Sequence, residues 1–282
     1  MWISEEAIEA WVPSSNGRRG APQRYSELAI ETALTLRLLF HLPLRQAEGF
    51  LRSLFDLMGL ELEAPDHTSL SRRSRALSVQ LDAPQRRQGT HLIVDSSGLS
   101  IVGEGEWAAT KHGRKGKRGW RKLHIGVDRA GVIVAQVLTD IGGEDSVTGV
   151  ELIEATAGKI KSVTGDAAYE TRGIYNAAEA RGGTVVVPPT RAAVVNHRKP
   201  RTPSRDRAIR RVERLGRWRW KKESGYHQQG RVENTFFRYK SILGDRLRSR
   251  NWAAQETEAI VACKLLNRLK AIGHPRSVAV RG

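Results

Sequence analysis

The hydrophobic periodicity of the chain changes several times between residues 91 and 189, and the order of these changes restricts the fold more than any other feature. Runs with the alternation typical of β-strands come first, and runs with apolar residues at helical spacing are placed between the later strands. The elements are predicted in the order strand, strand, strand, helix, strand, helix, strand, over residues 91–101, 122–128, 131–140, 146–157, 159–166, 171–183 and 184–189. This alternation predicts an α/β fold with a mixed sheet.

The order of elements is the layout of a ribonuclease-H-like mixed sheet, in which the first and fourth strands are neighbours. We expect a domain with this core to occupy residues 89–282. A basic, tryptophan-containing insertion is expected at about 190–225. After it, the segments GYHQQGRVENTFFRYKSILG and AAQETEAIVACKLLNRLKAIG are predicted to form two helices.

Residues 1–88 are predicted to form an all-α domain before this core. Two apolar helical stretches are separated by Pro43, and a short third helix is expected to begin with Asp66 or Thr68 as its N-cap. The exposed side of this third helix carries Arg72 and Arg73. Three short helices with a basic third helix resemble a helix-turn-helix DNA-binding domain. An ordinary helical bundle with arginines in solvent is the alternative.

The net charge of the chain is strongly positive. The sequence contains 47 Lys and Arg residues against 30 Asp and Glu residues, which gives +17 and an isoelectric point of about 10.6. This excess predicts a polyanionic partner, and double-stranded DNA is the first candidate. A solvated basic surface that only aids solubility is the alternative.

Much of the positive charge is concentrated in two segments, 111–122 and 191–222, and the second also contains two tryptophans. Arginine and lysine bind phosphates, and an indole ring can stack on a base of distorted DNA. The residues of these segments that we expect to contact DNA are Lys111, Arg114, Lys117, Arg118, Lys122, Arg217, Trp218, Trp220, Lys221 and Lys222.

Several classes of protein are excluded by the sequence. It has no run of about eighteen apolar residues, as a transmembrane helix requires, so no membrane partner is expected. The first residues lack the layout of a signal peptide. A single cysteine, Cys263, excludes a disulfide framework and a cysteine-based zinc site, and it is expected to pack inside the last helix. We expect a cytoplasmic protein.

Three acidic residues occupy positions that suggest a shared site. Asp95 lies inside the apolar first strand, where a charge is costly unless it is compensated, and Asp166 ends the fourth strand. Because these strands are expected to be neighbours, their carboxylates can converge, and the late helix can add Glu233. Converging carboxylates repel one another and are stable when divalent cations neutralise them, so we predict a site for two Mg²⁺ ions. Alternatively, each acid is a helix cap or a surface charge.

Four residues of the late helix are predicted to form one stripe. Tyr226, Gln229, Glu233 and Lys240 follow one another at steps of three, four and seven residues. Such a stripe would carry a metal-binding carboxylate and a phosphate-binding ammonium group, with Arg231 close in sequence but rotated away from Gln229. Alternatively, Glu233 and Lys240 lie in solvent and their spacing is accidental.

The segment GYHQQGRVENTFFRYKSILGDRL resembles the Y-(2)-R-(3)-E-(6)-K signature of bacterial DDE insertion-sequence transposases, in particular the insertion-sequence-five family. Further similar segments occur in the same order, among them PDHTSLSRR, HLIVDSSGLSIVGEGEWAATKHG, WRKLHIGVD and VTGDAAYETR. The resemblance extends over nearly the whole chain. The chain departs from the signature at Gln229, which stands at the arginine position.

The resemblance implies that residues 89–282 form the catalytic domain and that Asp95, Asp166 and Glu233 bind two Mg²⁺ ions, for which Mn²⁺ can substitute. Tyr226 and Lys240 fill the tyrosine and lysine positions of the signature. The implied activity is cleavage at transposon ends followed by strand transfer into target DNA. The implied partners are terminal inverted repeats, target DNA and further copies of the chain, as a homodimer or higher multimer, in the nucleoid of a bacterium.

Two alternatives to a transposase stay open. One is an enzyme with the same core but a different task, such as a nuclease without strand transfer. The other is a relic of a transposase with weakened catalysis that binds DNA, which the glutamine at position 229 allows.

Overall fold

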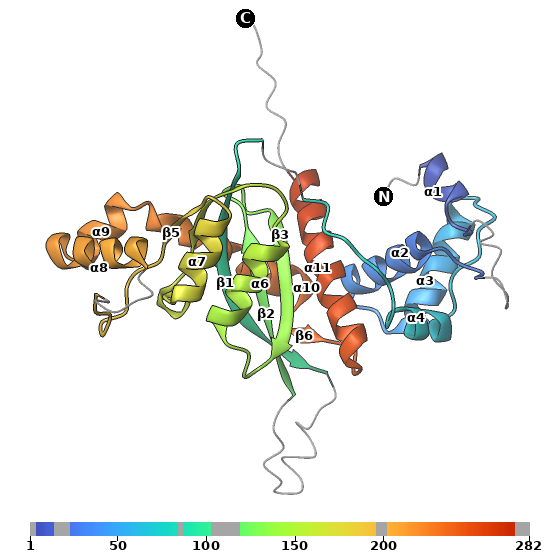
Figure 1. Cartoon of the computed structure of the whole chain (residues 1–282). Coiled ribbons are helices and arrows are strands. Elements are labelled where there is room, and N and C mark those ends of the chain that lie inside the picture. Colours follow the sequence, from blue (N-terminus) through green and yellow to red (C-terminus); the bar gives the residue numbers. More distant parts are fainter. Residues whose placement is uncertain (1–3, 14–22, 84–86, 103–118, 196–201, 274–282) are drawn as a thin grey trace, which may run out of the picture.

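The computed structural model describes residues 4–13, 23–83, 87–102, 119–195 and 202–273, and Figure 1 shows their arrangement. A sheet stands in the middle of the molecule. The N-terminal helices lie on one side of it, and helices of the basic insertion lie on the other. The expected DNA contacts Lys111, Arg114, Lys117 and Arg118 lie outside the described residues.

The described residues contain a six-stranded mixed sheet with the order β3-β2-β1-β4-β5, and β6 pairs with the far end of β1. Antiparallel pairing joins β1 to β2 and β2 to β3, whereas β4, β5 and β6 are parallel to their partners. The strands are β1 (Thr90–Ile101), β2 (Trp120–Val127), β3 (Ile133–Asp140), β4 (Ile160–Thr164), β5 (Thr184–Val186) and β6 (Arg246–Leu247). This is the predicted ribonuclease-H-like sheet, and the neighbouring position of the first and fourth strands is confirmed. The short β6 is not predicted from the sequence.

Helices cover both faces of the sheet because the apolar residues of β1 alternate between them. Leu92 and Val94 pack with α6 (Asp145–Ala155) and α7 (Arg172–Ala180). Ile93 belongs to a second apolar cluster, which it shares with α10 (Gly230–Leu243) and α11 (Trp252–Ile272). Asp95 follows Ile93 by two residues and therefore lies on the α10 face.

The N-terminal part is helical, as predicted, with α1 (Glu5–Glu9), α2 (Glu27–Leu39), α3 (Leu44–Leu57) and α4 (His67–Arg73). Asp66 is the N-cap of α4, and its side chain accepts hydrogen bonds from the backbone N–H groups of Thr68 and Ser69. The basic insertion contains two helices that the sequence does not predict, α8 (Pro203–Leu215) and α9 (Arg217–Glu223). None of the described helices is long and apolar enough to span a membrane.

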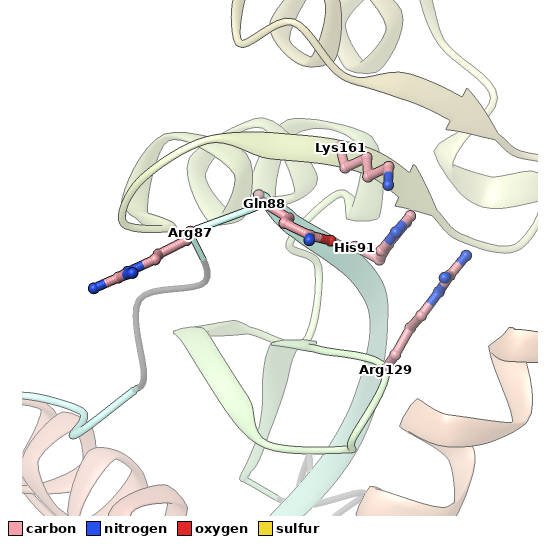
Figure 2. A pocket seen from close by; sticks show the side chains of 6 residues that line it. Arg87, Gln88, His91, Arg129 and Lys161 are labelled. Atoms are coloured by element: carbon pink, nitrogen blue, oxygen red, sulfur yellow. The ribbon is translucent and has the colours of Figure 1, made fainter.

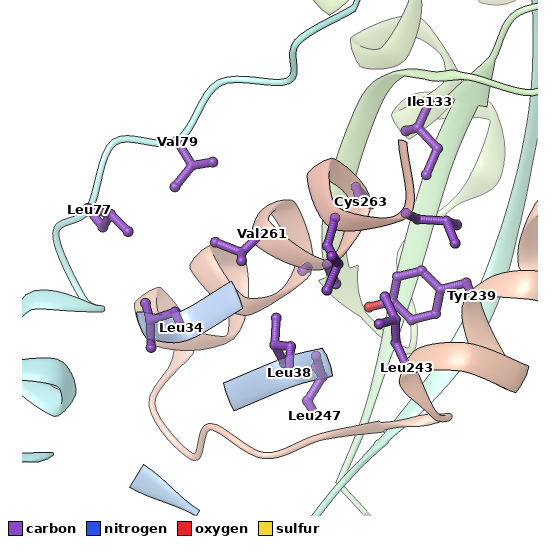
Figure 3. Close-up of a cluster of buried hydrophobic side chains, with 14 of the residues drawn as sticks. Leu34, Leu38, Leu77, Val79, Ile133, Tyr239, Leu243, Leu247, Val261 and Cys263 are labelled. Atoms are coloured by element: carbon purple, nitrogen blue, oxygen red, sulfur yellow. The ribbon is translucent and has the colours of Figure 1, made fainter. Parts of the chain in front are cut away.

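The N-terminal helices share a hydrophobic core with the sheet. Figure 3 shows Leu34 and Leu38 of α2 beside Val261 of α11, and the same cluster continues through Cys263 to Tyr239 and the sheet. Cys263 is fully buried, as expected for the last helix, and burial raises the pKa of its thiol to about 12. The described helices α2, α3 and α4 thus share one apolar cluster with the sheet.

Candidate active site

The first candidate residue, Asp95, follows three buried residues of β1 and is itself half-buried. It stands opposite Ile125 on β2, and its carboxylate accepts a hydrogen bond of 2.8 Å from the backbone N–H of Ser96. One backbone donor is incomplete compensation for a partly buried charge. The carboxylate therefore keeps the capacity to bind further donors or a cation.

Asp166 is brought to the same region by the close passage of the chain after β4. The paired residues Ile93 and Thr164 end the contact between β1 and β4, and Asp166 lies two residues beyond. Gly165 makes this passage possible, because a Cβ atom there would lie 2.9 Å from the Tyr169 ring and 3.1 Å from the Val94 side chain. The Asp166 carboxylate caps a short 3-10 helix (Ala167–Tyr169) through a 2.9 Å hydrogen bond from the N–H of Ala168.

Glu233 reaches this region from the first turn of α10. Val232 and Phe236 bury the inner side of the helix, and Glu233 itself is exposed. The start of the helix is tied to β1, because the side-chain amide of Gln229 donates a 3.2 Å hydrogen bond to the carbonyl of Val94. Val94 immediately precedes Asp95, so this hydrogen bond fixes the helix start beside the candidate site.

The electrostatics of Asp95 show that the charges of Asp166 and Glu233 both act on it. Burial raises the pKa of Asp95 to about 6, and the negative charges of Asp166 and Glu233 add to this rise. The hydrogen bond from Ser96 acts in the opposite direction. Burial also raises the pKa of Tyr226, again with contributions from Asp166, Glu233 and Asp95. Asp95 and Tyr226 therefore lie within the electrostatic influence of Asp166 and Glu233.

Among the described residues, no three side chains of His, Cys, Asp or Glu lie close enough together to surround one metal ion. The donor set still suits a hard cation, because carboxylate oxygens are the ligands that Mg²⁺ and Mn²⁺ prefer. Burial is the main cause of the raised pKa of Asp95, the charges of Asp166 and Glu233 add to it, and a bound cation would oppose both effects.

Replacement of Asp95 by Asn is expected to stabilise the metal-free protein at pH 7. A carboxyl with a folded-state pKa of about 6 against 3.8 unfolded destabilises the fold above pH 6, and this cost disappears as the pH falls below about 4. Because the carboxyl is half-buried and solvent screens part of its interactions, we expect a gain of about 1–3 kcal/mol in the free energy of unfolding at pH 7. Urea unfolding in EDTA at pH 7 and pH 4 measures it, and an equal gain at both pH values would contradict the electrostatic cause.

A fourth carboxylate, Asp145, lies on the opposite face at the start of α6 and was not identified from the sequence. Lys122 holds it at 2.7 Å, and the ring of the fully buried His124 lies 3.4 Å away. Burial opposes ionisation of Asp145, but hydrogen bonds from Lys122 and Ser96 outweigh it, so the pKa of Asp145 is lowered. The ammonium group of Lys122 thus neutralises Asp145. Lys122 was expected to contact DNA, but in the structure it forms this ion pair.

Tyr169 is a second residue that sequence analysis missed. Its ring fits between Gly149 and Gly165, where a Cβ atom would lie 2.8 Å and 2.9 Å from it. Its hydroxyl is buried, and burial together with the charges of Asp145, Asp95 and Asp166 raises its pKa. Tyr169 therefore fills the space behind the carboxylates. The glycines in VTGDAAY and VTGVE are the sequence signal for this ring.

The expected stripe on the late helix is interrupted. Residues Tyr226–Gln229 form a separate 3-10 helix, and α10 begins at Gly230. Gln229 is only 4% exposed, so its expected contact with DNA is corrected to a structural hydrogen bond with Val94. Glu233, Arg231 and Lys240 are exposed on α10.

The two tryptophans of the insertion differ in their surroundings. Trp218 is 77% exposed, with the ammonium group of Lys222 5.6 Å from its ring centroid. Trp220 is buried and packs against Tyr226 with ring centroids 6.3 Å apart, so its expected stacking on DNA is corrected to a packing role. Lys221 lies over the same Tyr226 ring at 4.7 Å. The Trp220 contact holds Tyr226 beside the carboxylates.

Three arginines from the sequence analysis also have defined positions. Arg217 donates a hydrogen bond of 2.6 Å to the carbonyl of Pro189, and Arg73 donates one of 3.0 Å to the carbonyl of Tyr25. Arg72 is exposed on α4. Among the described residues, Arg73 and Arg217 use their guanidinium groups in hydrogen bonds within the protein, and Arg72 does not. Of the three arginines, Arg72 is therefore best placed to contact a ligand.

Comparison with known families decides the identity of this fold and site. A family model described as "Transposase DDE domain" matches residues 86–268, and a second model with the same description matches residues 1–104. The chain belongs to the DDE transposase family. The match to residues 86–268 covers the sheet and all three candidate carboxylates of the DDE transposase.

Two solved structures are similar to this DDE transposase at low sequence identity. A cryo-EM structure of the piggyBac transposase synaptic complex with hairpin DNA is 12% identical, with 98% of this chain and 75% of that chain covered and a TM-score of 0.42. The Mos1 transposase paired-end complex with the left transposon end is 11% identical, with 79% and 81% covered and a TM-score of 0.27.

Proposed function

We propose that this chain is the transposase of a bacterial insertion sequence of the insertion-sequence-five family, which cleaves DNA at the ends of the element and joins them to target DNA. The observation that supports the proposal is that a chain of the DDE transposase family has a half-buried Asp95 on its central strand whose pKa is raised by burial and by the charges of Asp166 and Glu233. Its substrates would be the terminal inverted repeats and the target duplex, bound in the bacterial cytoplasm by a homodimer or higher multimer.

Two divalent cations fit this donor set if each is held by a pair of carboxylates. Asp95 and Asp166 would hold one Mg²⁺ or Mn²⁺, and Asp95 with Glu233 would hold the other, which is compatible with the lack of a three-residue cluster among the described residues. When bound, such a pair of ions activates an attacking oxygen and neutralises charge on a phosphodiester and its leaving oxygen.

The protein side chains would orient the DNA strand around this site. Lys240 is exposed on α10 and would bind a non-bridging phosphate oxygen. Tyr226, held by Trp220 and Lys221, would donate a hydrogen bond near the scissile phosphate. Trp218 offers an exposed ring for stacking on a distorted base, and Arg72 on α4 would contact duplex DNA.

The glutamine at position 229 bears on whether the protein is active. An arginine at this position would place a positive charge near the carbonyl of Val94 and the neighbouring carboxylates. Gln229 keeps the hydrogen bond to β1 but supplies no charge, and its side-chain oxygen is buried without a partner. We infer that the substitution preserves the position of α10 and reduces the compensation of Asp95, which favours a slower enzyme over loss of DNA binding.

A supercoiled plasmid that carries both element ends tests the proposed function. With Mg²⁺ or Mn²⁺ we expect nicked and linear products, and with EDTA none. Precut ends incubated with a second plasmid should give joined products. Cleavage without joining would indicate a nuclease, and binding of the ends without any metal-dependent nicking would indicate a catalytically inactive relic.

A further inference from the structure

A basic pocket lies at the end of the sheet where β1 and β4 begin. Its cavity of about 340 Å³ is lined by Arg87, Gln88, Gly89, His91, Arg129 and Lys161. Figure 2 shows Lys161 of β4 and Arg129 of the β2–β3 turn on two sides of His91. The Gln88 side chain points toward the imidazole ring of His91, whereas the Arg87 side chain points away from it. Within the part of the chain that the structure describes, no acidic residue lines this cavity.

The pocket is held by a close approach of two backbones. Gly89 has φ +86°, and a Cβ atom there would lie 3.3 Å from the carbonyl of Lys159. The next residue, Thr90, donates a 2.7 Å backbone hydrogen bond to the same carbonyl. This contact fixes Gln88, just before β1, and His91 on β1 beside Lys161 on β4, and it explains why a residue that tolerates positive φ precedes the strand.

The positive groups of the pocket are not compensated by the protein. Neither Lys161 nor Arg129 forms a salt bridge with any residue that the structure describes. Burial lowers the pKa of His91, and the charges of Arg129 and Lys161 lower it further. The Nδ1 atom of His91 is 2.7 Å from the hydroxyl of Ser162, which leaves Nε2 to interact with a ligand. A cavity with this charge excludes metal ions and attracts an anion.

The position of the pocket relates it to the candidate active site. His91 and Asp95 are four residues apart on regularly paired β1, so their side chains lie on the same face of the sheet, about 13 Å apart at 3.3 Å per residue. Phosphates of one DNA strand follow one another at about 3.4 Å along the helix axis. The distance therefore corresponds to about four base pairs.

We propose that Gln88, His91, Arg129 and Lys161 bind a phosphate group of the DNA backbone, about four base pairs from the phosphodiester held at Asp95. This inference rests on the proposed transposase function. Arg129 offers a planar guanidinium and Lys161 an ammonium group, which are the side chains that bind phosphate most strongly. The contact would fix the direction and register of the strand at the carboxylates without reading its sequence.

The salt dependence of DNA binding tests the proposal. The double variant Arg129→Gln/Lys161→Gln is compared with wild type in EDTA, by fluorescence anisotropy of labelled double-stranded DNA over a range of KCl concentrations. Loss of one neutralised phosphate is expected to reduce the slope of log K against log salt by about one unit. The control Lys159→Gln/Arg172→Gln removes equal charge from exposed positions outside the pocket and should change the slope less. Equal slopes for wild type and the pocket variant would overturn the proposal.

Phosphate ethylation interference locates the contact. Ethylation about four base pairs from the cleavage position should weaken binding by the wild type and have no effect on the pocket variant. A titration with inorganic phosphate, followed through the imidazole NMR signals of His91, distinguishes the source of the phosphate. If free phosphate shifts the His91 signals of the wild type, but the Arg129→Gln/Lys161→Gln variant binds DNA as the wild type does, the pocket binds a small anion and the DNA contact is rejected.

The outcomes also separate this inference from the proposed function. If the wild type cleaves plasmid DNA with Mg²⁺ but the pocket variant keeps its salt slope and its ethylation pattern, the pocket proposal alone fails. If the wild type never cleaves but the pocket variant shows the reduced slope, the phosphate site stands and the transposase activity fails. Both pocket substitutions are at exposed positions, so unchanged thermal unfolding is expected and confirms that the variant is folded.

Discussion

Asp95→Asn is expected to reduce Mg²⁺-dependent strand cleavage by at least about a thousandfold, because a bound cation pair supplies several kcal/mol of transition-state stabilisation and each 1.36 kcal/mol is worth tenfold. Asp95 is the carboxylate that both proposed ion sites share. Asparagine keeps the size of the side chain and the acceptor for the N–H of Ser96, but it lacks the charge that holds the ions. Cleavage of supercoiled plasmid at a fixed Mg²⁺ concentration measures the loss.

The loss of cleavage should not come with a loss of folding or of DNA binding. Asp95→Asn is expected to make the metal-free protein more stable at pH 7, so inactivity cannot be attributed to unfolding. Asp245→Asn, an exposed carboxylate near β6, is the matched control and should cleave at the wild-type rate. Cleavage by Asp95→Asn at a rate near that of the control would refute the assignment of Asp95.

The order of strands and helices was sufficient to predict which strands meet. Because the first and fourth strands of this layout are neighbours, Asp95 and Asp166 could be placed together from the sequence, and β1 pairs with β4 as predicted. A charged residue inside the apolar run HLIVD marked the position of the site. These features are local in sequence or follow from topology, so no knowledge of side-chain packing was needed.

Features that depend on packing could not be predicted in the same way. Gln229 and Trp220 belong to segments that suggest DNA contact, yet both side chains are buried. The 3-10 turn before α10 directs Gln229 toward Val94, and Tyr226 of the same turn packs against Trp220 of α9. Asp145 could not be identified from the sequence, since its partner Lys122 is 23 residues away on β2. Helical periodicity assumes one unbroken helix, and that assumption failed at Gly230.

The junction between the N-terminal helices and the sheet shows the same limit. Arg37 lies on the apolar face of α2 in the sequence pattern, where a long charged side chain gives no hint of its partner. In the structure it is buried and lies 3.7 Å from Glu258 of α11, 221 residues later. The carboxylate also accepts 2.8 Å hydrogen bonds from the N–H groups of Arg248 and Ser249. Glu258 thus joins α2, α11 and the chain after β6.

Glu258→Ala is expected to lower the free energy of unfolding by about 3–5 kcal/mol, because removal of one partner leaves a buried charge without compensation. Burial already lowers the pKa of Arg37, and the charge of Glu258 is what opposes this effect. The substitution also leaves two backbone N–H groups without their acceptor. Urea unfolding followed by tryptophan fluorescence and by circular dichroism measures the change.

Comparison with two further variants identifies the cause of this destabilisation. Arg37→Met should cost less than Glu258→Ala, because the carboxylate that remains keeps both of its backbone donors. Glu63→Ala removes a carboxylate from the exposed pair with Arg24 and should leave stability nearly unchanged. Since the helices and the sheet share one core, Glu258→Ala should unfold in a single transition by both probes. Two results would contradict a buried ion pair that couples the N-terminal helices to the sheet. One is unfolding of Glu258→Ala in separate transitions by fluorescence and circular dichroism, and the other is a loss of stability in Glu63→Ala as large as that in Glu258→Ala.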